Sequence, residues 1–378
     1  MYHHRVESFA QARRPDGTGQ RQGSLSLSLG LRLRSLALPF SSGASELPCE
    51  VAFLLDFGVP RIVLQQSLRL ARRHGVSADA ALLAEGLVEE EMFYRALAER
   101  LGLPFLASAF EIETDADFFA CARRGHARLS RDHGEMKWVC APQGAAVGRL
   151  IDAARTRSAR PGLAVATRAK FLDAATRATL SEVANLAPDM AERVSPKICA
   201  RRATEGRAFP IAVATGVVTF ATLFGAQGAL ALAAALPLAA LFAGAVTIRI
   251  FACRASLSLD EKDAEIADDR LPLYTVVIAL YREACVAPQI ARAIDRLDYP
   301  RAKLEVIFVV EENDAETRRI LRRFGPRAPH RILVAPRGEP QTKPRALNIA
   351  AAYAQGALVA VFDAEDIPEP KQLRRAAA

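Results

Sequence analysis

The chain has 378 residues, enough for two or three domains of roughly 100 to 200 residues, and its 51% hydrophobic and 24% charged residues are ordinary for a globular protein. The formal net charge is +8, a balance that suits either nucleic acid or an anionic membrane surface. No nucleic-acid-binding module accompanies the charge, so we expect a lipid bilayer as partner and no nucleic acid. The six cysteines form no Cys-x-x-Cys pair and indicate reduced cytosolic thiols, without a zinc site or disulfide framework.

Residues 1–45 are rich in Arg, Ser, Gly and Gln and have no sustained helical or strand period. We therefore expect a disordered basic tail. The basic start is not followed by an apolar core and a small-residue cleavage site, so a signal peptide is not expected. A misassigned start codon is the alternative.

Residues 46–200 are expected to form a small α/β module. Apolar residues at helical spacing mark two faces, and glycines punctuate them. The first face has Ile62, Leu64, Leu68 and Ala71, the second has Ala81 to Leu83, Met92, Phe93 and Leu97, and the glycines are Gly75, Gly86 and Gly102. A short strand is expected at Lys137 to Ala141, a turn at Pro142 to Gly144 and a helix at Lys170 to Leu180.

The segments RHGVSADAALLAEGLVEEEMFYRALAERLGLPFL and AVATRAKFLDAA resemble the N-terminal domain of type II secretion ATPases. Some members of that family bind cyclic di-GMP through an Arg-x-Gly and leucine-rich pattern, which implies this ligand near Arg73 and Gly75. The spacing after these two residues departs from the family pattern. The chain has no Gly-x-x-x-x-Gly-Lys-Ser/Thr phosphate loop, so it does not qualify as an ATPase.

No charged residue occurs between Arg207 and Arg249. The run divides at Gly225 to Gly228 into Ala208 to Phe224 and Ala229 to Ala252, each near the roughly 17 to 25 residues that cross a bilayer. We therefore expect a two-helix transmembrane hairpin over residues 205–254, with a buried hairpin in a soluble core as the alternative.

Arginines flank this apolar run on both sides. They are Arg201, Arg202 and Arg207 before it, and Arg249 and Arg254 at its end. The positive-inside rule then places both flanks in the cytoplasm. The expected location is a bacterial inner membrane, crossed more than once, with both soluble domains cytoplasmic.

Residues 270–378 alternate strand and helix patterns, which predicts β-α-β crossovers and a mostly parallel sheet. The expected strands are Thr275 to Leu280, Glu305 to Val310, Arg331 to Ala335 and Ala357 to Phe362. The helices between them contain Ile290 and Ile294, Arg318 to Phe324, and Arg345 to Tyr353. Acidic residues follow three of the four strands, at the sheet edge where ligands of such folds bind.

The segments PLYTVVIALYREACV, LDYPRAKLEVIFVVEEND, QTKPRALNIAAAYAQG and VFDAEDIPEPKQL resemble, in this order and spacing, family 2 glycosyltransferases of the processive, cellulose-synthase-like type. The resemblance implies an α/β fold, with a partial Rossmann-like GT-A domain that binds a nucleotide-sugar, UDP-glucose in particular. It implies donor-binding roles for Tyr281, Glu283, Glu311, Glu312, Lys343 and Asn348. It also implies Mg²⁺ or Mn²⁺ at Asp363, Glu365 and Asp366, where glutamate replaces the second aspartate of the family's Asp-x-Asp.

Each assignment has a structural alternative. Glu311 to Asp314 would also suit a solvated loop that caps a helix beginning near Ala315. Asp363 to Asp366 would suit an acidic turn, and Lys343 and Arg345 would suit surface charges. The functional interpretation depends on the four motifs occurring together.

Two features of the family pattern are missing from the sequence. No acceptor general base and no Gln-x-x-Arg-Trp motif follow the acidic motif, and the one tryptophan, Trp138, lies upstream of the apolar run. We therefore expect a truncated hexosyltransferase, with no assignable catalytic base, that binds its donor without efficient transfer. The alternative is a membrane-tethered regulatory or interaction protein with a non-catalytic glycosyltransferase-like half-domain.

Overall fold

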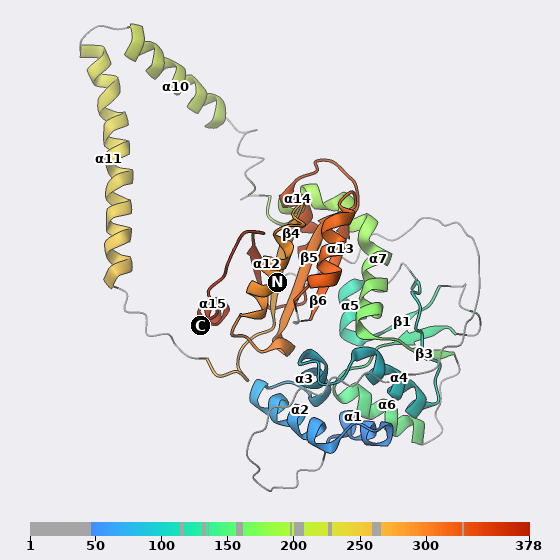
Figure 1. Ribbon diagram of the computed structural model, residues 1–378. Coiled ribbons are helices and arrows are strands. Elements are labelled where there is room, and N and C mark those ends of the chain that lie inside the picture. Colours follow the sequence, from blue (N-terminus) through green and yellow to red (C-terminus); the bar gives the residue numbers. More distant parts are fainter. Residues whose placement is uncertain are drawn as a thin grey trace. The chain divides into compact units, whose positions relative to one another are not determined.

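The computed structural model describes residues 47–113, 117–130, 134, 136–155, 162–196, 199, 208–225, 229–258, 266–326 and 329–378. They fall into two compact units (Figure 1). The main unit joins the described residues up to Ala187 with those from Ile266 onward, and the second unit lies within residues 188–264. The predicted tail at residues 1–45 lies outside the described residues.

The N-terminal half of the main unit is mostly helical with a small sheet. Its elements are α1 (Cys49–Ala52), η1 (Phe53–Phe57), α2 (Arg61–His74), α3 (Ala78–Ala84), α4 (Glu90–Leu101), α5 (Phe118–Arg124), β1 (His126–Arg128), β2 (Trp138–Cys140), α6 (Ala145–Arg155), β3 (Leu163–Val165) and α7 (Arg168–Leu186), and η2 (Ala187–Asp189) begins at its last residue. The sheet has the order β1-β2-β3, with β1 antiparallel and β3 parallel to β2. This agrees with the predicted α/β character of the segment.

Two of the predicted glycine breaks end helices of this half. Gly75 follows α2 with φ +65° and Gly102 follows α4 with φ +66°. Left-handed backbone of this kind costs glycine nothing, which is why it commonly ends helices.

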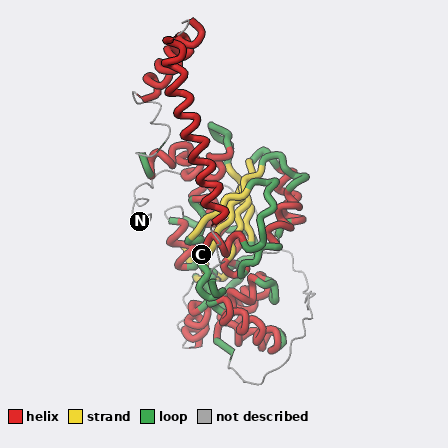
Figure 2. Tube along the Cα trace, turned by 90° about the vertical axis from the view of Figure 1, so that its left-hand side faces the viewer, coloured by secondary structure: helices red, strands yellow, loops and turns green. Residues whose placement is uncertain are grey.

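The described residues of the C-terminal half of the main unit form a four-stranded parallel sheet in the order β6-β5-β4-β7. Strands are coloured yellow in Figure 2. The elements of this half are β4 (Tyr274–Leu280), α12 (Ala287–Asp295), η3 (Arg301–Lys303), β5 (Leu304–Glu311), α13 (Ala315–Phe324), β6 (His330–Ala335), α14 (Lys343–Ala351), β7 (Leu358–Phe362) and α15 (Gln372–Ala377). The predicted strands, the helices between them and the parallel sheet are confirmed.

The central strands β4 and β5 are buried on both faces, which explains their continuous apolar sequence. Successive side chains alternate between the faces. Ile278 and Phe308 pack on one face in a core that includes residues of α12 and α13. Val277 and Val309 pack on the other face with α14 and the N-terminal half.

The two halves of the main unit therefore share one core. The rings of Phe118 on α5 and Tyr353 after α14 meet edge to face, with centroids 4.9 Å apart. Arg331 on β6 donates from Nη1 to Thr176 Oγ1 on α7 at 3.2 Å. No pattern in the sequence had indicated this contact.

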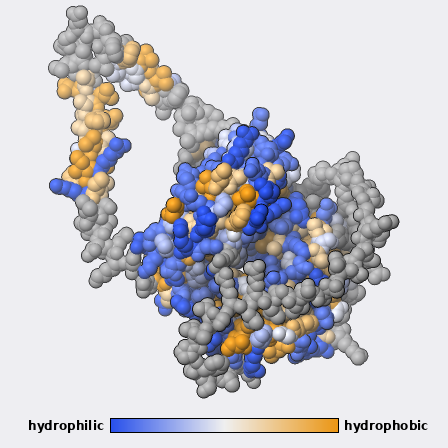
Figure 3. Space-filling view, viewed as in Figure 1, coloured by the Kyte–Doolittle hydropathy of each residue, from blue (hydrophilic) through white to orange (hydrophobic). Residues whose placement is uncertain are grey.

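The second unit contains α8 (Met190–Val194), α10 (Ala208–Gly225) and α11 (Ala229–Ser258). Among the described residues, one helical stretch is long and apolar enough to cross a membrane, Ala235–Arg254, with a mean hydropathy of 1.9 and no part of it buried (Figure 3). The apolar stretch of α10 is shorter, Pro210–Phe220. The two expected helices are present, but by length and composition one of them qualifies as a span, so a transmembrane hairpin is not shown.

Candidate functional site

Several predicted site residues lie at the carboxyl edge of the parallel sheet, whereas Asn348 on α14 faces the N-terminal half. Glu283 follows β4, Glu311 ends β5, and Asp363 follows β7, while Lys343 begins α14. Because parallel strands point the same way, their ends meet at one edge, the usual ligand-binding edge of open α/β sheets. The loop between β6 and α14, residues 336–342, borders the same edge.

A lysine lies among the carboxylates of this edge. Lys343 Nζ forms an ion pair with Asp363 Oδ1, and both side chains are about half exposed. Burial raises the pKa of Glu283, the backbone N–H of Tyr281 lowers it, and the nearby carboxylate of Glu365 raises it further. Lys343 also lowers the pKa of Glu283, so charges from three loops meet here.

The predicted metal ligands Asp363, Glu365 and Asp366 do not form a complete coordination site on their own. Asp363 is paired with Lys343, and Asp366 Oδ2 accepts a hydrogen bond of 2.8 Å from the backbone N–H of Asp363. Within the described residues, no group of three or more His, Cys, Asp or Glu side chains is placed to hold a metal ion. The oxygen donors are of the kind that Mg²⁺ and Mn²⁺ prefer, and further oxygens from a ligand would be needed to complete a coordination shell.

The two adjacent glutamates at the end of β5 have different environments. Glu311 is 5% exposed, and its Oε2 atom has no hydrogen-bond partner. Burial raises the pKa of Glu311, while Arg345 and Gln341 lower it. Glu312 instead accepts a hydrogen bond from the backbone N–H of Arg337 at 3.2 Å, which ties the β5 end to the loop before α14.

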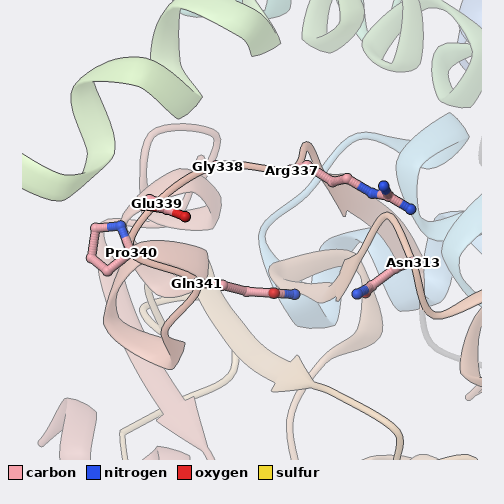
Figure 4. Close-up of a pocket in the computed structure, with 6 residues that line it drawn as sticks. All are labelled: Asn313, Arg337, Gly338, Glu339, Pro340 and Gln341. Carbon is pink, nitrogen blue, oxygen red and sulfur yellow. The ribbon is translucent and has the colours of Figure 1, made fainter.

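An open pocket of about 490 Å³ lies beside these glutamates. It is lined by Asn313, Arg337, Gly338, Glu339, Pro340 and Gln341, and the side chains of Asn313 and Gln341 point toward each other across it (Figure 4). A pocket of this volume accepts a group of small-molecule size. Asn313 and Gln341 lie in segments that carry the family resemblance, whereas Arg337 to Pro340 carry no motif, so the sequence did not reveal that these residues enclose a pocket.

Three polar residues of the C-terminal half have contacts that the sequence did not reveal. Asn348 lies on α14 and donates to the carbonyl oxygen of Ala187 at 2.9 Å, on the side of the N-terminal half. Arg345 is 3% exposed and donates to the carbonyl oxygen of Pro336 at 3.0 Å. Asp314 caps α13 through the backbone N–H of Thr317 at 3.1 Å, the role that the structural alternative had proposed.

Residues 272–378 match the family model described as "Glycosyltransferase like family 2". A search of curated proteins gave no match. Among solved structures, the chain is similar to the mannosyltransferase PcManGT from Pyrobaculum calidifontis, determined in complex with GDP-Man and Mn²⁺, at 27% identity and a TM-score of 0.31. The similarity covers 38% of this chain and 41% of that chain, less than half of either.

The C-terminal half of the main unit is thus a glycosyltransferase family 2-like domain. The family match includes the whole parallel sheet and every predicted site residue. It does not reach residues 46–200, and no comparison supports the resemblance of that module to type II secretion ATPases, which stays a prediction.

Proposed function

We propose that the site binds a nucleoside-diphosphate sugar together with a divalent cation, as the donor half of an inverting glycosyl transfer to a polysaccharide or other glycan. The observation that carries the proposal is the edge of carboxylates after β4, β5 and β7, within the segment that matches family 2 glycosyltransferases. The regulatory alternative would retain the same fold, and donor binding separates the two.

The nucleoside is proposed to lie between the β4 and β5 ends and the loop before α14. The unpaired Oε2 atom of Glu311 is an acceptor that a ribose or base donor group would satisfy. Glu283 is the second carboxylate in reach of this region. The pocket between Asn313 and Gln341 supplies amide groups on facing sides (Figure 4).

The diphosphate is proposed to bind on the side of Asp363 and Lys343. Asp363 and Glu365 would hold Mg²⁺ or Mn²⁺, with Asp366 beside them and phosphate oxygens completing the shell. Bound there, the cation would stabilise the charge of the leaving diphosphate. Lys343, at the start of α14, would add a point charge beside the phosphates, and the amino end of the helix favours the same anion.

For the donor itself, we propose UDP-glucose as the first nucleotide-sugar to test, because the motifs resemble those of cellulose-synthase-like enzymes.

A second proposed ligand is cyclic di-GMP at the N-terminal module, and this proposal rests on the resemblance to type II secretion ATPases alone. Arg73 donates to Asp268 at 2.9 Å, and a β-carbon at Gly75 would lie 2.9 Å from the carbonyl oxygen of Asp269, so this corner is filled by the chain itself.

We further propose that α10 and α11 anchor the chain in a bacterial inner membrane with both soluble parts in the cytoplasm. The apolar stretch Ala235–Arg254 and the arginines that flank residues 208–248 support this proposal. Labelling of Cys199, before α10, and of the exposed Cys285, after β4, in intact cells with a membrane-impermeant reagent tests the topology. Both cysteines should stay unlabelled until the membrane is opened, and labelling of either one before that rejects it.

Donor binding is tested by measuring the affinity of the full chain in detergent for UDP-glucose, with Mn²⁺ and with a chelator. Asp363→Asn removes a metal ligand, so we expect the Mn²⁺-dependent affinity to fall by about tenfold or more. The matched control is Asp152→Asn on α6, an exposed aspartate paired with Arg155 in the N-terminal half, which should bind like wild type. If the affinity changes neither with the cation nor with the Asp363 substitution, the proposal is rejected. The same measurement is made with GDP-mannose as the second donor.

A further inference from the structure

Asp314 connects two loops of the site edge. Its side chain is buried, and both of its carboxylate oxygens accept hydrogen bonds from backbone groups. Oδ1 accepts from the N–H of Thr317 at 3.1 Å and caps α13, while Oδ2 accepts from the N–H of Arg282 at 2.5 Å. Capping of α13 accounts for the Oδ1 atom only. The hydrogen bond to Oδ2 joins the loop after β5 to the loop after β4.

Arg282 has a backbone conformation that a side-chain-bearing residue rarely adopts. Its φ is +59°, in the left-handed region, where the β-carbon crowds the following carbonyl group. Such a conformation persists only where surrounding contacts hold it. Two contacts are available: the bond from its N–H to Asp314, and its guanidinium, which lies over the Tyr281 ring at 5.1 Å from the centroid.

The conformation of Arg282 sets the direction of Glu283, the next residue. Glu283 Oε2 lies 3.4 Å from the backbone nitrogen of Tyr281, so the turn folds the carboxylate back over its own loop. In that position Glu283 interacts electrostatically with Glu365 and Lys343. If Arg282 relaxed to an extended or right-handed conformation, the chain would leave the turn in another direction and Glu283 would leave this group.

We infer that Asp314 is a positioning residue of the donor site, which holds Arg282 in its left-handed turn and thereby aims Glu283 at the ligand. This inference rests on the proposed donor binding. It adds a residue that would touch no ligand and would act through the backbone of another loop. Asp314 is therefore more than the helix cap that the sequence suggested.

The test is a double-mutant cycle on donor affinity. In Asp314→Ser the single, shorter hydroxyl can still cap α13 but cannot also reach Arg282, so we expect the dissociation constant for the donor to rise by about tenfold. Arg282→Gly allows the left-handed turn without cost. In that background, Asp314→Ser should change the affinity by less than about twofold, because glycine adopts the left-handed turn without the strain that the hydrogen bond to Asp314 offsets. Equal losses in both backgrounds would overturn the inference.

Asp117→Ser is the matched control, because Asp117 caps α5 through the N–H of Phe119 at 3.0 Å, far from the site in sequence. Serine can still cap α5, as it can α13, so this change should leave both the melting temperature and the donor affinity nearly unchanged. Amide hydrogen exchange of the peptide containing Tyr281 to Glu283 gives a readout without donor. Exchange should become faster in Asp314→Ser and not in Asp117→Ser, and unchanged exchange in Asp314→Ser rejects the inference. If wild type binds no donor, the proposed function fails, whatever the exchange experiment shows.

Discussion

Glu311 combines burial with an unpaired carboxylate oxygen, which is a costly arrangement in a chain without ligand. Burial raises its pKa, although Arg345 and Gln341 lower it. A carboxyl group whose folded pKa is raised contributes stability below the ordinary glutamate pKa of about 4.3 and loses that contribution as the pH rises through the folded value.

Glu311→Gln should therefore make the ligand-free protein more stable at neutral pH and flatten its pH dependence above about pH 4.3. The same change should weaken donor binding, because the free acceptor is lost. Urea unfolding of both proteins from acid to neutral pH measures the first effect. Glu312→Gln is the control, since Glu312 accepts a backbone hydrogen bond, and a stability gain there as large as at Glu311 would contradict this account.

The position of the acidic residues at one sheet edge was predictable from the sequence, because they follow continuous β-branched runs that indicate buried parallel strands. The sequence could not show which of Glu311 and Glu312 keeps an unpaired carboxylate oxygen, since adjacent residues at a strand end point to opposite sides. That difference depends on the N–H of Arg337, which comes from a loop 25 residues away. The ion pair between Lys343 and Asp363 was also beyond the sequence, because it joins α14 to the end of β7.

At the scale of elements, Asp268 ties the segment that leads into β4 to two helices. Its carboxylate accepts from Arg73 at the end of α2 at 2.9 Å and from Arg374 on α15 at 2.6 Å, and His74 Nε2 lies 3.9 Å away. Burial alone would raise the pKa of Asp268, but the hydrogen bond and charge of Arg374, and then those of Arg73, lower it below its ordinary value.

Asp268→Asn should cost about 2 kcal/mol of unfolding free energy at neutral pH, the scale of hydrogen bonds to a charged group. The folded pKa is lowered, so this contribution is present above the ordinary aspartate pKa of about 3.9 and disappears as the pH falls below it. Wild type and variant should therefore converge in acid unfolding curves. Asp298→Asn, a half-exposed partner of the same Arg374, should cost much less, and equal costs would refute the role given to Asp268.

The elements of the C-terminal half were predictable because buried parallel strands are continuous β-branched runs with helical patterns between them. The N-terminal half was harder. Strands β1 and β3 have three residues each, too few for a period, and their pairing with β2 joins segments far apart in the chain. The helices α5 and α6 were not identified, since short apolar runs fit helix or strand equally well.

At the scale of the whole molecule, the shared core implies that the two halves of the main unit unfold together. Phe118, Thr176 and Thr179 of the N-terminal half meet Tyr353 of the C-terminal half, whose hydroxyl lies 3.1 Å from Thr179 Oγ1. Burial raises the pKa of Tyr353 to about 12, in keeping with its position inside the core.

Tyr353→Ala should therefore destabilise the N-terminal half as well, by about 3 kcal/mol, the usual cost of removing a buried aromatic ring. The one tryptophan of the chain, Trp138, lies on β2 of the N-terminal half and reports its unfolding by fluorescence. We expect the Trp138 transition to shift in Tyr353→Ala and not in Phe324→Ala, which removes a half-exposed ring from α13. A Trp138 midpoint unmoved by Tyr353→Ala would mean that the halves unfold separately.

The shared core also determines when the main unit can complete its fold during synthesis. The hydrogen bonds that join α7 to β6 and to Tyr353 span 155 to 177 residues of sequence, with α10 and α11 translated in between. At about 5 to 20 residues per second, the ribosome needs about 8 to 35 seconds to supply the missing side. Collapse of a chain takes microseconds. The apolar surface around Phe118 is therefore synthesised long before Tyr353, which follows α14, is available to cover it.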